Sequence, residues 1–238
     1  MKKLAAPLAF AAVAAATALP AQAGRPLNTE DATTLGDWAC QLESWVDRYR
    51  GNTSDYFFVP ACAAFGVEAQ FGWQNTRAEH VSRTAGQFFQ LKHAFKSIDD
   101  GDWGVGFVAG ISRDRLRAEK TGWGDPYFIV PFSVGLGADK DTRWVVHLNL
   151  GGTRARDEGK NVTLWGVAFE KPVTERFAVV GEVFGENSRN PWMRLGGVYT
   201  VIDETLSVDL TYVKRSGGLK EENYWSLGFH LETAPLLK

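Results

Sequence analysis

Apolar and polar residues alternate along most of the chain, as in "WVVHLNLGGTRARDEGKNVTLWGVAFE" (residues 144–170), where two alternating stretches flank a charged loop. Alternation with a period of two is typical of strands with one apolar face, and no segment carries a helical stripe of useful length. The sequence therefore predicts an all-β protein. About twelve strands are expected, at residues 38–49, 55–61, 66–76, 86–97, 102–113, 125–137, 142–153, 161–170, 176–186, 191–201, 205–214 and 223–231.

The links between these segments differ in length. The short ones are near residues 97–101, 138–141, 171–175 and 202–204, and the longer, more charged ones are 77–85, 114–124, 154–160 and 215–222. Outer-membrane barrels alternate short and long connections, and each tilted strand needs about 9–11 residues to cross the bilayer. We therefore predict a transmembrane, antiparallel, up-and-down β-barrel. An even number of strands requires a turn within "PACAAFG", for which Pro60 and Gly66 are suitable.

The two faces of the expected strands differ in charge. One phase is uncharged and apolar, for example Trp144, Val146, Leu148 and Leu150, whereas the opposite phase carries many ionisable groups, too many for a surface in contact with lipid. We therefore expect the apolar phase to face lipid. The candidates for lining the lumen are Glu68, Gln70, Lys92, His147, Asn149, Glu170, Glu182, Arg194 and Asp209. The alternative is a soluble β-sandwich or lipocalin-like barrel with the apolar phase inside, which would have a wide interior to fill.

The start of the chain has the pattern of a signal peptide. Two lysines, an Ala-rich apolar stretch and the small residues "AQA" precede Gly24, before which we expect cleavage. The expected organisation is a signal peptide at 1–23, an N-terminal periplasmic or lumenal segment at 24–37, the barrel at 38–231 and a C-terminal tail at 232–238. The mature chain is then expected in the outer membrane, in contact with its lipids and inserted by the outer-membrane assembly machinery.

Charge and motifs narrow the function. Cleavage removes Lys2 and Lys3, so 26 basic residues become 24 against 28 acidic ones, a formal charge of −4. This gives no basic surface, and nucleic acid is not an expected partner. The glycines of "GVGFVAG" and "GEVFGE" lack the spacing of a nucleotide-binding loop. We expect no cofactor, no metal ligand and no catalytic residue.

Cys40 and Cys62 are the two cysteines, in a chain expected to reach an oxidising compartment. They are equally distant from a hairpin turn around Gly51, so that they would face each other on the first two strands. The favoured prediction is a disulfide, and free structural thiols or metal and redox chemistry are the alternatives.

The lumenal charges allow several functions. They could pair across strands into a network that fills a narrow barrel, which would make the protein a structural barrel with an occluded lumen. They could instead line a channel or transporter for a small solute, with apolar or aromatic solutes among the candidates. For the charges themselves the structural network is the favoured interpretation, whereas for the protein as a whole the leading prediction is the channel. A lipid-modifying barrel enzyme is a third hypothesis, because His147 and Asn149 share a face and Ser133 could lie on the preceding strand.

Several segments carry a family resemblance. The segments "GRPLNTEDATTLGDWACQLESW", "PAC", "FQLKHAF", "WGVGF", "GEVFGE" and "LSVDLTY" resemble an uncharacterised group of Gram-negative outer-membrane barrels, and the resemblance covers most of residues 25–214. That group is similar to proteins described as transporters of the meta-cleavage pathway of phenol degradation. The resemblance implies a barrel and a channel, and no binding residue is carried over from it. In one departure, "HLETAPLLK" follows Phe229, where such barrels end on an aromatic residue of the last strand.

Overall fold

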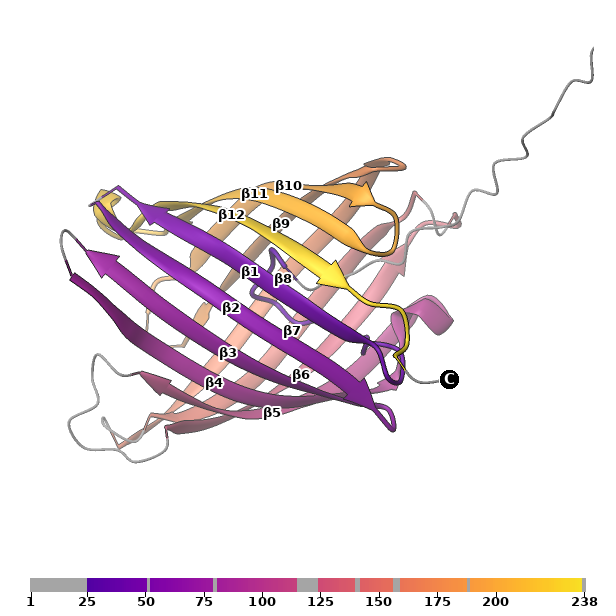
Figure 1. Ribbon diagram of the computed structural model, residues 1–238, viewed down its shortest axis with the longest axis horizontal. Helices are drawn as coiled ribbons and strands as arrows, with labels where there is room; N and C mark the ends of the chain where they lie inside the picture. Colours follow the sequence, from indigo (N-terminus) through magenta and orange to yellow (C-terminus); the bar gives the residue numbers. More distant parts are fainter. Residues whose placement is uncertain are drawn as a thin grey trace, which may run out of the picture.

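The chain forms one closed β-barrel. The computed structural model describes residues 25–50, 52–78, 81–114, 124–139, 142–155, 159–187 and 189–236, so the expected leader lies outside the described residues. In the described part, antiparallel strands pair with their neighbours in sequence, and β12 pairs with β1 to close the ring (Figure 1). The strands are β1 (Cys40–Tyr49), β2 (Thr53–Ala64), β3 (Val67–Ala78), β4 (Val81–Lys96), β5 (Trp103–Asp114), β6 (Asp125–Leu136), β7 (Trp144–Ala155), β8 (Lys160–Thr174), β9 (Phe177–Glu186), β10 (Trp192–Ile202), β11 (Leu206–Arg215) and β12 (Tyr224–Glu232). The predicted all-β barrel of about twelve strands is confirmed.

Some strands are longer than the apolar alternation predicted. The expected link 77–85 is wrong, because β3 continues to Ala78 and β4 begins at Val81. β8 likewise continues to Thr174 and leaves a shorter turn than expected. Alternation marks only the part of a strand in which apolar and polar residues follow one another regularly, so it does not reveal extensions such as "VSRTA" (residues 81–85) and "KPVT" (residues 171–174).

The turn expected in "PACAAFG" is present, but Pro60 is not part of it. Phe65 and Gly66 connect β2 to β3 with positive φ angles of 55° and 73°, as a tight two-residue hairpin turn requires. Pro60 lies inside β2, opposite Leu42 of β1. On the β3 side the paired residues of β2 run from Thr53 to Phe58 and resume at Ala61, so the missing N–H of proline falls where the ladder is interrupted.

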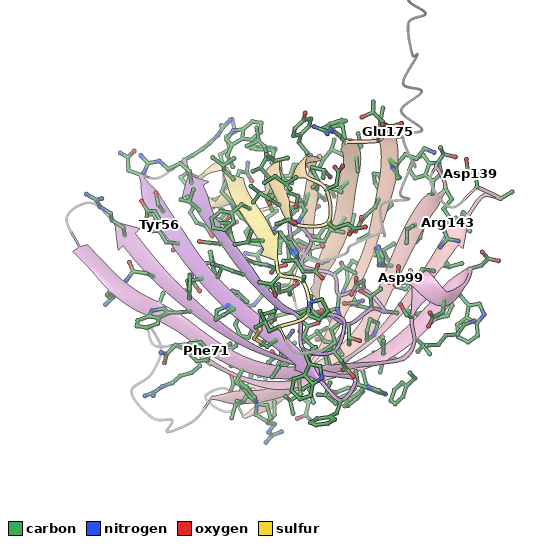
Figure 2. All side chains as sticks on the ribbon, turned by 45° about the vertical axis from the view of Figure 1, so that its right-hand side comes forward. Tyr56, Phe71, Asp99, Asp139, Arg143 and Glu175 are labelled. Atoms are coloured by element: carbon green, nitrogen blue, oxygen red, sulfur yellow. A yellow bond between two sulfur atoms is a disulfide. The ribbon has the colours of Figure 1, made fainter. Side chains whose placement is uncertain are left out.

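The connections lie at two ends of the barrel. We call the end where β1 begins and β12 ends the near end, and the opposite end the far end. The near end carries the C-terminal ends of β2, β4, β6, β8 and β10, and the short 3-10 helix η1 (Ile98–Asp100) lies there between β4 and β5. The far end carries the C-terminal ends of β1, β3, β5, β7, β9 and β11, and the short 3-10 helix η2 (Lys220–Glu222) lies there between β11 and β12. Asp99, Asp139 and Glu175 mark near-end turns in Figure 2.

The apolar phase of the strands points out of the barrel. On β7, Leu148 is 42% exposed, whereas its neighbour His147 on the opposite phase is 0% exposed. Tyr56 and Phe71, labelled in Figure 2, belong to the same exposed apolar surface. The alternative of a soluble barrel with the apolar phase inside is therefore wrong. Among the described residues, no helix is long and apolar enough to span a membrane.

The C-terminal residues after β12 lie against the start of β1. Thr233 N donates to Cys40 O at 2.8 Å, and Leu236 N donates to Trp38 O at 2.8 Å. The first residues of the tail therefore extend the contact between the last and the first strands at the near end.

The predicted disulfide between Cys40 and Cys62 is confirmed. The two residues are register partners on β1 and β2, and their Cα atoms are 4.0 Å apart. The bond links the first two strands two residues beyond Pro60, where Cys62 again pairs with Ala69 of β3. It therefore secures β2 to β1 beside residues 59–60, at which the pairing of β2 with β3 is interrupted.

We expect a Cys40→Ser/Cys62→Ser variant to have a lower free energy of unfolding in a urea titration followed by tryptophan fluorescence. For a loop of 22 residues, the chain-entropy model gives an upper value of about 3 kcal/mol, and closure of the barrel reduces it because the strand ends are already held together. The reduced wild-type protein is the control, and it should unfold like the variant. An unchanged titration midpoint in both would contradict this role.

Candidate functional site

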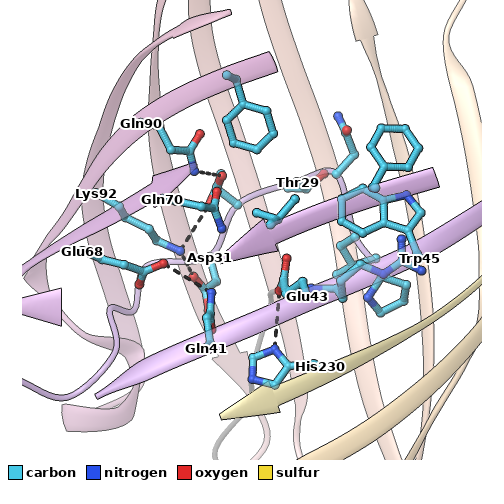
Figure 3. Close-up of a pocket in the computed structure, with 18 of the residues that line it drawn as sticks. Thr29, Asp31, Gln41, Glu43, Trp45, Glu68, Gln70, Gln90, Lys92 and His230 are labelled. Carbon is cyan, nitrogen blue, oxygen red and sulfur yellow. Dashed lines mark hydrogen bonds and ion pairs between the residues drawn. The ribbon is translucent and has the colours of Figure 1, made fainter. Parts of the chain in front are cut away.

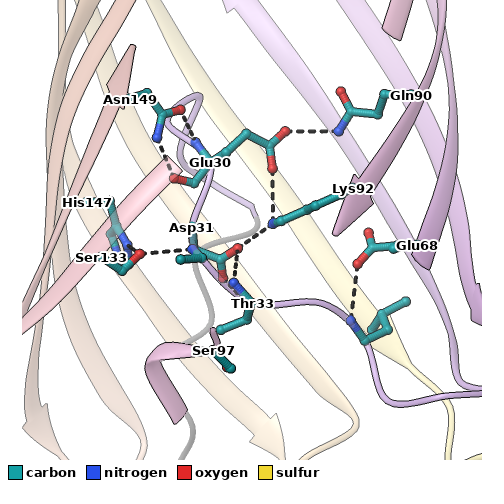
Figure 4. Close-up of polar contacts among 12 residues, drawn as sticks. Glu30, Asp31, Thr33, Glu68, Gln90, Lys92, Ser97, Ser133, His147 and Asn149 are labelled. Carbon is teal, nitrogen blue, oxygen red and sulfur yellow. Dashed lines mark hydrogen bonds and ion pairs between the residues drawn. The ribbon is translucent and has the colours of Figure 1, made fainter. Parts of the chain in front are cut away.

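Residues 25–36, which we call the N-terminal segment, lie among the inward side chains of the barrel (Figure 4). Its backbone amides donate to lumenal side chains. Thr29 N donates to Glu182 Oε2 at 2.9 Å, Ala32 N to Ser133 Oγ at 2.9 Å and Leu35 N to Glu68 Oε2 at 3.2 Å. These acceptors lie on β9, β6 and β3, so the segment crosses the interior and is held from several sides.

Lys92 forms ion pairs with two carboxylates of the N-terminal segment, those of Glu30 and Asp31. Its Nζ lies 3.1 Å from Glu30 Oε2 and also pairs with Asp31, and Lys92 is buried. Gln90 Nε2 donates to Glu30 Oε1 at 2.9 Å. Asn149 Nδ2 donates to the Glu30 carbonyl, and its Oδ1 accepts from Glu30 N, both at 2.7 Å. The carboxylates of the segment therefore match a cation and one amide of the wall, and a second amide, that of Asn149, binds the backbone of Glu30.

The expected pairing of lumenal charges across strands is found for one pair of candidates. Arg194 Nε lies 3.1 Å from Glu182 Oε1, on register partners of β10 and β9. Glu68 and Lys92 are also register partners, but Glu68 accepts from Leu35 N while Lys92 pairs with Glu30 and Asp31. The N-terminal segment supplies these partners, so most of the polar contacts join the barrel wall to the segment and do not join one strand to the next.

The remaining lumenal candidates have separate surroundings. Asp209 pairs with Arg25 of the segment at 2.6 Å, and Glu170 lies 3.5 Å from His147. Gln70 lines a large cavity described below. The sequence interpretation missed the segment residues Arg25, Glu30 and Asp31 and the inward phase of β1. The alternation of Glu43, Trp45 and Asp47 on β1 was the available signal for that phase.

Ser133 and His147 are close, as the hypothesis of a lipid-modifying enzyme required. Ser133 Oγ lies 2.8 Å from His147 Nδ1, and both residues are 0% exposed. The third member would be Glu170, not Asn149, because Glu170 Oε1 lies 3.5 Å from His147 Nε2. The serine oxygen already accepts from Ala32 N and faces the interior, away from the lipid-facing phase. This geometry suits a role in holding the N-terminal segment, and it does not bring the serine hydroxyl into contact with lipid.

A cavity of about 660 Å³ occupies the interior between the N-terminal segment and the walls formed by β1 to β6, β10 and β12 (Figure 3). Its ionisable lining is acidic. Eight carboxylates face three arginine or lysine side chains, and His230 is also present. The carboxylates are Glu30, Asp31, Glu43, Asp47, Asp55, Glu68, Asp99 and Glu232, and the cations are Arg25, Lys92 and Arg194.

Aromatic rings also line this cavity. Trp45 and Phe57 stack with their centroids 4.4 Å apart and nearly parallel planes. Tyr49 and Tyr224 form a second pair, with their ring centroids 4.8 Å apart. Carboxylates beside aromatic faces favour organic cations, which interact with both. In the described part of the chain, no group of three or more His, Cys, Asp or Glu side chains is arranged to hold a metal ion.

A family model matches residues 9–232, which is most of the sequence. The chain belongs to this family, described as uncharacterised conserved protein UCP029691. No curated protein matches the chain. The family resemblance expected from the sequence therefore holds at the level of a barrel family. The comparisons name no transporter of the meta-cleavage pathway, so that part stays a prediction.

Solved structures of outer-membrane porins share the fold. The KdgM porin in complex with disordered oligogalacturonate matches with a TM-score of 0.54 and 7% identity, over 81% of this chain and 98% of that chain. The KdgM porin alone gives a TM-score of 0.55 with the same identity and coverage. The NanC porin gives a TM-score of 0.49 and 11% identity, over 82% of this chain and 100% of that chain. At 7% identity the likeness to the two KdgM porin structures shows the fold alone, a barrel of the outer-membrane type.

Proposed function

We propose that this protein is an outer-membrane channel for small cationic solutes. The observation that carries the proposal is the excess of carboxylates around the lumenal cavity. A ring of acidic groups in a low-dielectric passage attracts cations and repels anions. The apolar outer face and the porin-like fold support a place in the outer membrane, reached after cleavage of the leader at residues 1–23.

The charge of the cavity argues against an anionic solute. The KdgM porin shares the fold and was solved with oligogalacturonate, a polyanion. Here the same type of barrel carries eight carboxylates against three arginine or lysine side chains around its cavity. A polyanion would meet repulsion from this lining, so the shared fold does not transfer that solute to this chain.

Two further candidates each have one observation in their favour. The stacked rings of Trp45 and Phe57 suit an aromatic solute, which the resemblance to meta-cleavage pathway transporters also implies. The N-terminal segment inside the barrel suits a structural barrel with an occluded lumen. We propose no catalytic role, because the Ser133 and His147 pair is buried beneath the segment.

The proposed function predicts a cation-selective current. We expect refolded mature protein in planar bilayers, with a gradient of KCl across the membrane, to give a reversal potential of the sign that K⁺ permeation produces. Asp47→Asn/Asp55→Asn should shift this potential towards zero, because both carboxylates line the cavity. Asp203→Asn, which removes an exposed charge on a near-end turn, is the matched control. An anion-selective current or a closed barrel would refute the proposal, and addition of phenol to the same bilayers tests the aromatic candidate.

A further inference from the structure

A guanidinium group is bound to the wall of the barrel by a fork of hydrogen bonds. Arg25 donates from Nη2 to Asp209 Oδ1 at 2.6 Å and from Nε to Asp209 Oδ2 at 3.3 Å. Nη2 also donates to Ser226 Oγ at 3.1 Å. The side chains of Arg25 and Asp209 are 4% and 2% exposed. Two parallel bonds to one carboxylate are the geometry by which proteins distinguish a guanidinium from an ammonium group.

An aromatic ring completes the contacts of this group. The Cζ atom of Arg25 lies 4.5 Å from the ring centroid of Trp45, which is stacked on Phe57. A cation above an indole ring is attracted by its negative face, and more strongly where water is excluded. The guanidinium therefore meets a carboxylate, a hydroxyl and an aromatic face, each from the barrel wall.

Gly228 leaves the space in which the guanidinium lies. On β12 it pairs with Trp45 of β1 on one side and with Asp209 of β11 on the other. A Cβ atom at Gly228 would lie 2.7 Å from Arg25 Nη2 and 2.8 Å from Arg25 Nε. The guanidinium thus rests on the backbone of β12. We call Trp45, Asp209, Ser226 and Gly228 the guanidinium site.

The site and its occupant belong to different parts of the chain. The four residues of the site lie on three adjacent strands, whereas Arg25 lies on the N-terminal segment. Without Arg25 the strands would still hold the site together, and the Asp209 carboxylate would be left buried without its cation. An uncompensated buried charge is unfavourable, so the vacated site would favour another guanidinium.

A second acceptor lies beside the site. Asp47 is buried and is the register partner of Ser226. It lines the cavity of about 660 Å³, as Arg25 and Trp45 do. Its Oδ1 atom has no hydrogen-bond partner in the part of the chain that the structure describes. A solute with a guanidinium at one end and an amine at the other could therefore place its second cation near this oxygen.

We propose that the guanidinium site binds solutes that carry a guanidinium group, and that Arg25 occupies it as an internal ligand until such a solute displaces it. The proposal rests on the cation channel proposed above and names the chemical class that its lumen recognises. Because Arg25 is tethered beside the site, it competes at a high effective concentration. The intact chain should therefore bind such a solute weakly, and a chain without the Arg25 side chain should bind it more tightly.

Calorimetric titration of the refolded mature chain tests the site with two matched solutes. Agmatine carries a guanidinium and an amine on a four-carbon chain, and putrescine carries two amines on the same chain. We expect Arg25→Ala to bind agmatine at least about 10-fold more tightly than the wild type does. Putrescine should bind to Arg25→Ala at least about 10-fold more weakly than agmatine, because an ammonium cannot form the fork.

Variants of the wall locate the binding. In the Arg25→Ala background, Asp209→Asn should weaken agmatine binding by at least about 10-fold, whereas Asp203→Asn on a near-end turn should not change it. Folding of each variant is checked by its heat-modifiable mobility on gels. Arg25→Lys keeps a cation in the segment and serves as the second variant if Arg25→Ala does not fold, with the same expected direction of change.

The outcomes separate this proposal from the function on which it rests. Equal agmatine affinity in the wild type and Arg25→Ala, equal affinity for the two solutes, or no effect of Asp209→Asn would overturn the guanidinium site. Reversal potentials are measured on the same preparations. A cation-selective channel that fails these titrations overturns the site alone, and selective agmatine binding by an anion-selective or closed barrel overturns the proposed channel alone.

Discussion

Replacing Lys92 with methionine should release the N-terminal segment and raise the conductance of the barrel. Lys92 is the buried cation that pairs with both Glu30 and Asp31 of the segment, and Glu68 is its register partner. Without it, three carboxylates face one another with no nearby cation from this cluster. Removal of one partner of a buried ion pair costs about 3–5 kcal/mol, which is comparable to the net stability of many domains. Single-channel recordings and urea titrations measure the two effects.

A second substitution tests whether the charge causes this effect. Lys92→Met/Asp31→Asn also removes one of the two carboxylates that pair with Lys92 and should recover about half of the lost stability. Lys220→Met, which removes an exposed lysine from η2, should change the stability by less than about 0.5 kcal/mol. Equal losses in Lys92→Met and Lys220→Met would show that the segment is not held by this cluster.

An arginine at Leu148 should prevent most of the protein from inserting. Leu148 lies in the middle of β7, on the outward phase, between Phe132 of β6 and Val167 of β8. A cation on the lipid face near the bilayer midplane costs about 2–4 kcal/mol, and it would displace an apolar side chain that already faces outward. The fraction of heat-modifiable, folded protein recovered from the membrane fraction measures the effect.

The same charge placed inside the barrel is the control. Gln70 lines the acidic cavity, so Gln70→Arg adds a cation beside carboxylates of the lumen and should insert as the wild type does. If Leu148→Arg and Gln70→Arg inserted equally well, the outward phase would not be in contact with lipid.

The strands could be predicted because each carries its own pattern. Trp144 to Leu150 alternate with polar or small residues, and this alternation identified β7 without reference to any other part of the chain. The pairing of Cys40 with Cys62 was likewise local, since it required the register of a single hairpin. The far ends of β3 and β4 were missed because their sequences, "RA" (residues 77–78) and "VSRTA" (residues 81–85), do not continue the regular alternation of large apolar and polar residues.

The N-terminal segment could not be predicted in the same way. Arg25, Glu30 and Asp31 are the charged residues of a short stretch, residues 25–36, that has no repeat indicating a surface or a core. Their partners Asp209 and Lys92 are separated from them by 184 and 61 residues. Only closure of the barrel brings these groups together, so pairwise charge patterns along the sequence contain no information about which of them will meet.

The attachment of the segment to many strands has a consequence for the order of folding. Its partners lie on β1, β3, β4, β6, β7, β9, β10, β11 and β12, so that each contact depends on a different part of the ring. None of the distant contacts can form in an isolated hairpin, and the β1–β12 seam joins residues from the two ends of the chain, such as Glu43 and His230. Contacts of such long range make folding slow and form late. Docking of the segment and closure of the seam should therefore occur together, as a single late kinetic step.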